Sequence, residues 1–226
     1  MRRILIFLFC ALFLWSASFP AAAAPKIFYK YVGSTNKMRV ALTFDDGPHP
    51  RYTPQILDIL KEYGVSATFF AVGVNAETYP ELILRELNEG HEVGNHTYNH
   101  YHVNKLTQTA LCNDIMACNS ALEKITQQHV RLFRPPEGVC TGALKNVCET
   151  EDLTIVLWSV DTRDWAHTPI PDIVAGVRAN VQDGAIILMH DFIGKKSPTP
   201  AALRQIIPML QRSGDEFVTI SRLLEG

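Results

Sequence analysis

The chain has 226 residues, of which 47% are hydrophobic, and its formal net charge is −2 at pH 7. This length and composition fit one globular domain with a sizeable core. The near-neutral charge excludes the strongly basic surface that nucleic-acid binding proteins carry, so no nucleic-acid partner is expected.

The N-terminus predicts export from the cytoplasm. Arg2 and Arg3 precede an apolar run at 4–15, and alanines follow at 21–24. This order is typical of a secretory signal peptide, here residues 1–24, although an uncleaved membrane anchor is the alternative. The apolar run is short for a membrane span. We therefore expect a periplasmic, cell-envelope or extracellular protein with an N-terminal extension at 25–36 and one folded domain at 37–226.

From residue 37 onward, short apolar strands alternate with amphipathic helices. Strands are predicted at 40–44, 67–72, 92–95, 131–134, 155–158, 185–189 and 217–219. Helices are predicted at 53–63, 77–89, 107–126, 142–148 and 171–181, with a last one from Thr199 to just before Gly214. Thr53 and Thr199 each precede a proline and are predicted as helix N-caps.

This alternation predicts an α/β fold, because parallel strands need long crossover connections and helices usually supply them. Seven such units favour a distorted, roughly seven-stranded (β/α) barrel over an open doubly wound sheet. No Gly-x-Gly-x-x-Gly follows the first strand, which removes the main argument for a dinucleotide-binding fold.

Four cysteines follow the predicted signal peptide: Cys112, Cys118, Cys140 and Cys148. An even number in an oxidising compartment favours one or two structural disulfides. Three connectivities are possible, and a link between the helix with the first two and the helix with the last two is plausible.

Two adjacent carboxylates, Asp45 and Asp46, end the strand at 40–44. A turn does not require such a pair, whose mutual repulsion costs free energy unless a cation offsets it. His96 and His100 follow the strand at 92–95, and one helical turn between them would direct both imidazoles at one metal. One Asp and both histidines therefore predict a divalent-metal site, with the second Asp free for proton chemistry.

Further polar residues follow other predicted strands. Arg134 suits a clamp on a catalytic carboxylate. Asp161, Asp164 and Trp165 follow the strand at 155–158, and His190 follows the strand at 185–189. The carboxyl ends of barrel strands form one face, so these side chains are expected to converge there with the two aspartates and histidines.

Five segments resemble the motifs of the polysaccharide deacetylases, the NodB homology domain or carbohydrate esterase family 4, in the family's order. They are Thr-Phe-Asp-Asp-Gly-Pro (43–48), His-Thr-Tyr-Asn-His (96–100), Arg-Pro-Pro (134–136), Asp-Thr-Arg-Asp-Trp (161–165) and Leu-Met-His (188–190). The resemblance covers about residues 37–224 and implies a distorted β/α barrel, in agreement with the pattern of elements.

The resemblance implies a role for each matching residue around one divalent metal ion, usually zinc and sometimes cobalt. Asp46, His96 and His100 match the metal ligands. Asp45 matches the general base, and Arg134 matches the residue that orients this base.

Other matching residues concern the leaving group and the substrate. His190 matches the general acid, and Asp164 matches the carboxylate that pairs with it. Trp165 and Leu188 match the apolar pocket for the acetyl methyl group. Glu137 departs from the common motif, which has Tyr there. Its carboxylate is expected to face the substrate groove and to disfavour acidic glycans or favour cationic ones.

The resemblance thus implies a metal-dependent N-deacetylase acting on peptidoglycan, a chitin-like oligosaccharide or an exopolysaccharide. The alternatives are an esterase or amidase for another acyl substrate, and a catalytically silent carbohydrate-binding domain. A monomer without a stable protein partner is expected.

Overall fold

The computed structural model describes residues 26–29, 38–194 and 196–225. The signal peptide predicted at 1–24 lies outside the described residues, as does most of the predicted extension at 25–36. Within the described part of the chain, no helix is long and apolar enough to cross a membrane.

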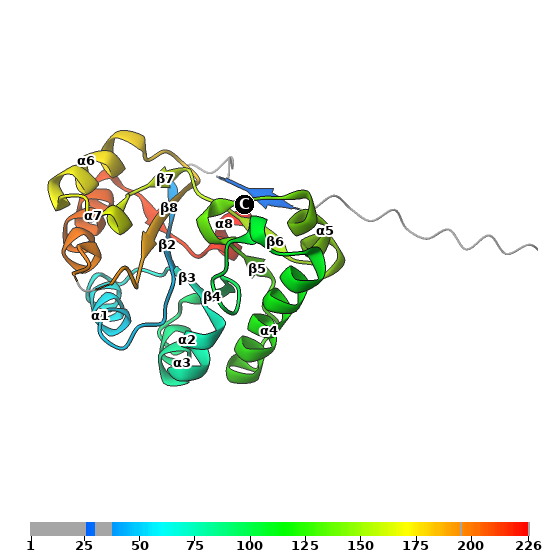
Figure 1. Cartoon of the computed structure of the whole chain (residues 1–226). Coiled ribbons are helices and arrows are strands. Elements are labelled where there is room, and N and C mark those ends of the chain that lie inside the picture. The colour runs from blue at the N-terminus through cyan, green and yellow to red at the C-terminus, as the bar shows by residue number, and fades with distance from the viewer. Residues whose placement is uncertain (1–25, 30–37, 195, 226) are drawn as a thin grey trace, which may run out of the picture.

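The framework is one parallel sheet in the order β1-β6-β5-β4-β3-β2-β8-β7, with β9 also paired to β2. The strands are β1 Ile27–Phe28, β2 Arg39–Asp45, β3 Thr68–Ala71, β4 Glu92–Asn95, β5 Leu132–Phe133, β6 Thr154–Val156, β7 Val160–Asp161, β8 Ala185–His190 and β9 Glu216–Phe217. The sheet curls with helices around its outer face (Figure 1), which confirms the predicted α/β barrel-like fold. The unpredicted strands are β1, from the predicted extension, and β7.

The sheet is surrounded by α1 Thr53–Tyr63, α2 Gly73–Thr78, α3 Pro80–Asn88, α4 Gln108–Thr126, α5 Gly142–Thr150, α6 Ile170–Asn180 and α7 Thr199–Ser213, with α8 Ile220–Leu224 near the C-terminus. The helix predicted at 77–89 is instead two helices, because Tyr79 leaves helical geometry and Pro80 begins the next helix. Thr219, predicted in a strand, caps α8 by accepting a hydrogen bond from the Arg222 N–H.

Strand β2 is the centre of the fold. All seven of its residues are buried, as expected for a parallel strand covered on both faces. On one face, its side chains pack in a core cluster with α1, α6 and α7. On the other face, Ala41 packs with Phe70, Ile186 and Leu223, which places α8 against the inside of the curled sheet. The end of β2 is therefore held rigidly, and it carries Asp45.

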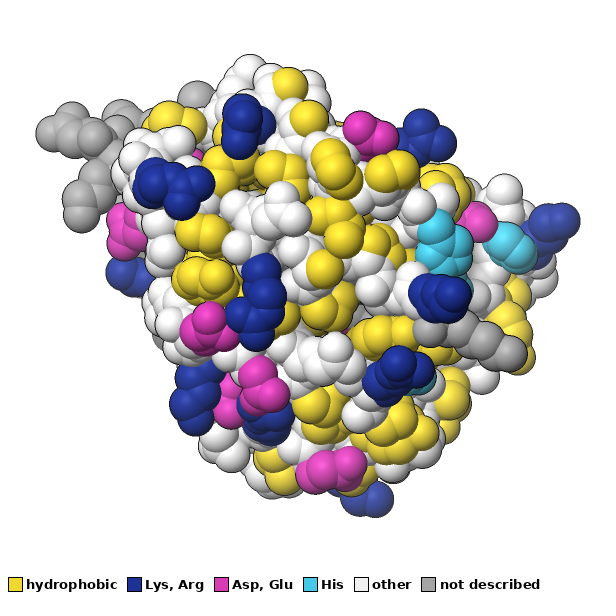
Figure 2. Space-filling view, turned by 90° about the vertical axis from the view of Figure 1, so that its left-hand side faces the viewer, with side chains coloured by type: hydrophobic (Ala, Val, Ile, Leu, Met, Phe, Trp, Pro, Cys, Tyr) yellow, Lys and Arg dark blue, Asp and Glu magenta, His cyan; other side chains and the backbone are white. Residues whose placement is uncertain are grey.

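Figure 2 shows the face that α1, α6 and α7 cover. Basic and acidic side chains are interspersed there among apolar ones, rather than gathered by sign.

The prediction that Thr53 and Thr199 cap their helices is wrong. Each residue already belongs to its helix, and neither side chain caps it. The hydroxyls instead donate to buried carboxylates, Thr53 to Asp191 at 2.5 Å and Thr199 to Asp164 at 2.6 Å. A buried carboxylate oxygen without a donor would cost free energy, which favours this use of the hydroxyls. By contrast, Gly64 ends α1 as predicted, in the left-handed conformation.

The predicted disulfides are absent, because the four described cysteines are free thiols. Cys112 and Cys118 lie on different sides of α4. Six residues of helix correspond to about 600° of rotation, which leaves the two side chains about 120° apart around the helix axis. The Cys118 thiol faces the carbonyl of Ala71 in β3, whereas the Cys112 thiol lies near Glu151 at the end of α5. Buried Cys148 belongs to the cluster between α4 and α5, so Cys118 points away from it.

Candidate active site

The predicted site residues converge at the carboxyl ends of the strands, around a cavity of about 470 Å³. The cavity is lined by Asp45, Asp46, His96, His100, Glu137, Trp158, Asp161, Trp165, Leu188 and His190. Arg134 and Asp164 are fully buried directly behind this lining. Residues from β2, β7 and β8 and from the loops after β2, β4, β5, β6 and β7 thus meet in one place, as the sequence predicted.

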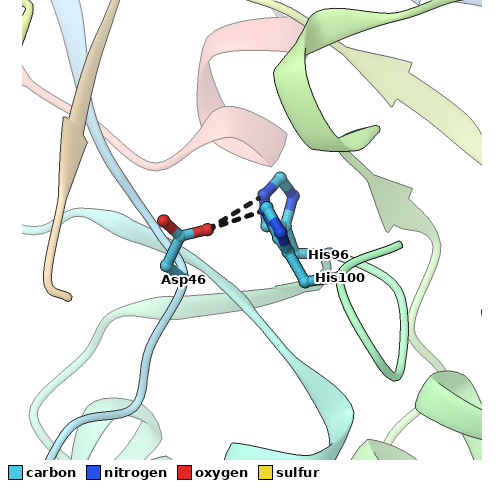
Figure 3. A group of neighbouring side chains, drawn as sticks. All are labelled: Asp46, His96 and His100. Carbon is cyan, nitrogen blue, oxygen red and sulfur yellow. Dashed lines mark ion pairs between the residues drawn. The ribbon is translucent and has the colours of Figure 1, made fainter. Parts of the chain in front are cut away.

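Asp46, His96 and His100 form a compact triad, with one ligand atom from each lying within 4.8 Å of the others. Nε2 of His96 lies 3.4 Å and Nε2 of His100 lies 3.1 Å from Oδ1 of Asp46. Figure 3 shows both imidazoles facing this carboxylate. Within the described part of the chain, Oδ1 is buried and accepts no hydrogen bond of standard geometry.

The two histidines are not on a helix, contrary to the prediction. Residues 96–100 form an irregular loop, with Thr97 at φ 68° and His100 at φ 56°. The left-handed residues reverse the chain locally, and this reversal, rather than helical spacing, brings the imidazoles together. The ring centroids are 5.0 Å apart.

The loop is held by polar side chains beneath it. The Asn95 side chain accepts from the Thr97 N–H at 2.7 Å, and the Thr97 hydroxyl accepts from the His100 N–H at 3.1 Å. From α4, Asp114 accepts from the backbone of Tyr98 and from the side chain of Asn99. Asp114 thus supports the loop that carries the two histidines, a role that the sequence analysis missed. Its signal in the sequence is a carboxylate next to a core position, Ile115, in a predicted helix.

The donor set of the triad fits a divalent cation. Nδ1 of His96 lies 2.7 Å from the carbonyl oxygen of Arg134, which can accept only if Nδ1 carries the proton. In the neutral imidazole, Nε2 of His96 then presents a lone pair to the Asp46 carboxylate, and two such electron-rich atoms face each other stably only around a cation. Histidine ligands of metals commonly donate their second N–H to a carbonyl in this way.

The electrostatics of Asp46 agree with a cationic environment. Burial opposes its ionisation, but the neighbouring imidazoles of His100 and His96, when protonated, outweigh burial and lower the pKa of Asp46. One carboxylate oxygen with two imidazole nitrogens suits zinc or another divalent transition metal.

Asp45 is held by the fully buried guanidinium of Arg134. The Arg134 Nη1 donates to Oδ1 of Asp45 at 2.7 Å and to the Thr43 hydroxyl at 2.8 Å. Its remaining nitrogens donate to the carbonyls of Val156 and Leu157, both at 3.1 Å. Oδ2 of Asp45 lies 3.8 Å from Nε2 of His96, beside the triad. The guanidinium therefore fixes the orientation of Asp45 next to the ligand atoms.

His190 ends β8, directly opposite Asp45 in the strand register. Its Nδ1 lies 2.8 Å from Oδ1 of Asp164, whose Oδ2 accepts from the His190 N–H and from the Thr199 hydroxyl. Burial lowers the pKa of His190, but the Asp164 contact and nearby carboxylates raise it more, to about 9. The imidazole is therefore protonated at neutral pH. Thr199 is a second residue missed from the sequence, where its Thr-Pro pair indicated only a helix start.

The cavity wall combines apolar and acidic groups. Trp165 is 49% exposed, and Leu188 is buried on β8. Trp158, predicted only as a strand residue, also lines the cavity. The Glu137 carboxylate lies at the rim, where its side chain is 52% exposed and pairs with His102 at 3.0 Å.

Comparison with known proteins places this site in a family. The family model described as "Polysaccharide deacetylase" matches residues 32–156. The peptidoglycan-N-acetylglucosamine deacetylase of Bacillus cereus is 42% identical over 84% of this chain and 89% of its own. A chitooligosaccharide deacetylase of a Bradyrhizobium species is 37% identical over 81% of this chain and 90% of its own.

A solved structure of a peptidoglycan N-acetylglucosamine deacetylase superposes with a TM-score of 0.83 at 37% identity, covering 87% of this chain and 92% of that one. Both sequence and fold therefore agree with the motifs that converge on the cavity. The chain belongs to the polysaccharide deacetylase family, carbohydrate esterase family 4, and is a carbohydrate-deacetylating hydrolase.

Proposed function

We propose that this protein is an exported, metal-dependent hydrolase that removes N-acetyl groups from amino sugars of peptidoglycan, chitin-like oligosaccharide or exopolysaccharide and releases acetate. The observation that carries the proposal is the placement of two buried pairs, Asp45–Arg134 and His190–Asp164, beside the Asp46–His96–His100 triad in one cavity. A ligand set, a base and an acid are what amide hydrolysis requires.

Asp46, His96 and His100 would hold one divalent ion, zinc, cobalt or another. When bound, such an ion lowers the pKa of a coordinated water and polarises the acyl carbonyl. The short approach of His96 Nε2 to Asp46, with Nδ1 directed at the Arg134 carbonyl, supports this assignment.

Asp45 is assigned as the general base, which takes a proton from the attacking water. Arg134 occupies Oδ1 of this carboxylate, so Oδ2 is the atom directed at the triad. A fixed base at short range of the nucleophile avoids the entropic cost of orienting it during the reaction.

His190 is assigned as the general acid. Its Nδ1 is engaged by Asp164, which leaves Nε2–H as the donor to the sugar nitrogen. An amine leaves readily only after protonation, so a protonated histidine on the opposite side from the base completes the reaction. Trp165 and Leu188 support an apolar pocket for the acetyl methyl group.

The proposal is tested by measuring acetate release from N-acetylated chito-oligosaccharides and from peptidoglycan by the zinc-loaded protein. Release from either substrate is expected, and chelation or Asp45→Asn should abolish it in protein that still folds. Release only from O-acetylated sugars or other amides would favour the esterase or amidase alternative. Oligosaccharide binding without release by metal-loaded protein would favour a silent binding domain.

Export is proposed on the residues at 1–24 alone. The test is the N-terminal sequence of the mature protein recovered from the producing cell and the compartment that contains it. A chain that keeps Met1 and remains in the cytoplasm would contradict the signal peptide.

A further inference from the structure

A buried carboxylate that none of the assigned roles uses lies under the turn that follows β2. Asp191 directly follows His190, and only 1% of it is exposed. Among the described residues, its Oδ1 has no hydrogen-bond partner. A buried polar atom without a partner costs free energy. A buried group of this kind calls for an explanation, which the contacts of Asp191 supply.

Asp191 contacts the segment 45–49 at several points. Its backbone N–H donates to the carbonyl of Asp45 at 3.1 Å. Its Oδ2 accepts from the Thr53 hydroxyl at 2.5 Å, and the same hydroxyl accepts from the N–H of His49 at 2.8 Å. The beginning of the segment is thus tied directly to Asp191, and its end is tied through Thr53.

The middle of the segment is also in contact with the carboxylate. A Cβ atom added at Gly47 would lie 1.9 Å from Oδ2 and 2.3 Å from Oδ1 of Asp191. Gly47 is not among the positive-φ residues, so the close approach, rather than the backbone conformation, requires glycine here. The next side chain, Phe192, stacks on the His49 ring with centroids 4.6 Å apart.

These contacts join the two halves of the site. The pairing of β2 with β8 ends at Asp45 and His190, and Asp46 lies beyond this last pair in a left-handed conformation, with φ 78°. Among the described strands, no pairing therefore fixes Asp46. Asn75 Nδ2 donates to the Asp46 carbonyl at 2.8 Å, and the Val72 N–H donates to the Gly47 carbonyl at 2.9 Å. From the β8 side, the segment is held by the residue after His190.

We propose that Asp191 is a positioning residue that holds the Asp46–His49 segment, so that the ligand Asp46 and the base Asp45 keep their places relative to His190. The inference rests on the proposed roles of those three residues. Asp191 is not among the residues that line the cavity, and it acts through Gly47 and Thr53.

The first test compares Asp191→Ala with the wild-type protein. Loss of an outer-shell partner commonly lowers metal affinity or activity about 10- to 100-fold. We expect a fall of that size in kcat, with KM little changed because Trp165 and Leu188 stay in place. A fall of similar size is expected in the zinc affinity of the metal-free protein, measured by competition with a chelator. Asp215→Ala is the matched control, since Asp215 is buried and its carboxylate oxygens lack partners in the described part of the chain.

The second test uses the contact with Gly47. Gly47→Ala alone should lower kcat and zinc affinity, because the new methyl group would collide with the carboxylate. In the Asp191→Ala background the same methyl group enters vacated space. The double variant should therefore lose much less than the product of the two single losses.

Several outcomes would overturn the inference: wild-type kcat and zinc affinity in Asp191→Ala, equal losses in Asp215→Ala, or additive losses in the double variant. If Asp191→Ala does not fold, Thr53→Val and Asp191→Asn replace it. The first should reproduce the losses, and the second should stay close to wild type, because an amide oxygen still accepts from Thr53. Absence of acetate release by the wild-type protein would count against the proposed function, while zinc affinity would still test Asp191.

Discussion

Replacing Arg134 by Met is expected to destabilise the fold as well as the reaction. The guanidinium is 0% exposed and is the largest fully buried side chain described. It lies over the Phe70 ring, with Cζ 4.2 Å from the centroid. A methionine side chain can occupy much of the space beside this ring. What methionine cannot replace is the positive charge beside Asp45.

The magnitude follows from the groups left behind. Removing one partner of a buried ion pair costs about 3–5 kcal/mol, because the other charge stays buried and uncompensated. The carbonyls of Val156 and Leu157 also lose their donors, at about 1–3 kcal/mol for each unsatisfied group when no water replaces the donor. The terms are not additive, so we expect a loss of about 4 kcal/mol in the free energy of unfolding, dominated by the ion pair.

The assay is urea denaturation of the metal-free protein, followed by far-ultraviolet circular dichroism. Metal is removed because a bound cation would itself offset the negative charge of Asp45. The double variant Asp45→Asn/Arg134→Met should be more stable than Arg134→Met alone, because the buried side chain at position 45 is then a neutral amide instead of a charged carboxylate. A loss below about 1 kcal/mol for Arg134→Met, or no recovery in the double variant, would refute the reasoning about the buried charge.

Three further predictions concern the site. Burial lowers the pKa of His190, but Asp164 and nearby carboxylates raise it from 6.5 to about 9. The acid form therefore persists below that value, so kcat should fall as pH rises through it, and Asp164→Asn should move this fall to lower pH in a pH–rate profile. The stability that the His190–Asp164 pair contributes should be fully present below pH 6.5 and should be lost as the pH rises through about 9. Thermal unfolding at several pH values would measure this loss. Glu137→Gln should raise kcat/KM for acidic glycans about 2- to 5-fold at low salt and little at high salt; an equal gain for neutral chito-oligosaccharides would contradict an electrostatic cause. Zinc should raise the melting temperature of the wild-type protein but not of His100→Ala, and equal shifts in a thermal-shift assay would exclude His100 as a ligand.

Much of the fold could be predicted because its signals are local. The helix at 53–63 and the strand at 92–95 were predicted with the bounds that the structure has, since hydrophobic period and terminal Gly or Pro residues mark such elements directly. The two-residue strands β1 and β7 escaped prediction. Elements this short have no measurable period, and their pairing partners lie far away in the chain.

The residues that form the site were predicted more completely than the residues that hold them in place. His96, His100 and one of the two adjacent aspartates were recognised because metal-ligating residue types stood together after predicted strands, and the family resemblance identified Asp46 as that aspartate. Asp114 and Asp191 were not assigned roles, because a carboxylate that binds backbone or hydroxyl groups looks in the sequence like any solvated acid. The loop at 96–100 was predicted as helical because an i, i+4 histidine spacing carries no information about the sign of φ.

The sequence by itself determined the alternation of strands and helices, the residues at the strand ends and the chemistry that they can perform. Tertiary structure alone decided which hydroxyl meets which carboxylate. Thr53 and Thr199 look alike in the sequence, yet one binds Asp191 and the other Asp164. It also decided that Cys118 faces β3 instead of another thiol. The physical reason is that periodicity and caps are set by neighbours along the chain, whereas these contacts join groups brought together only when the sheet curls.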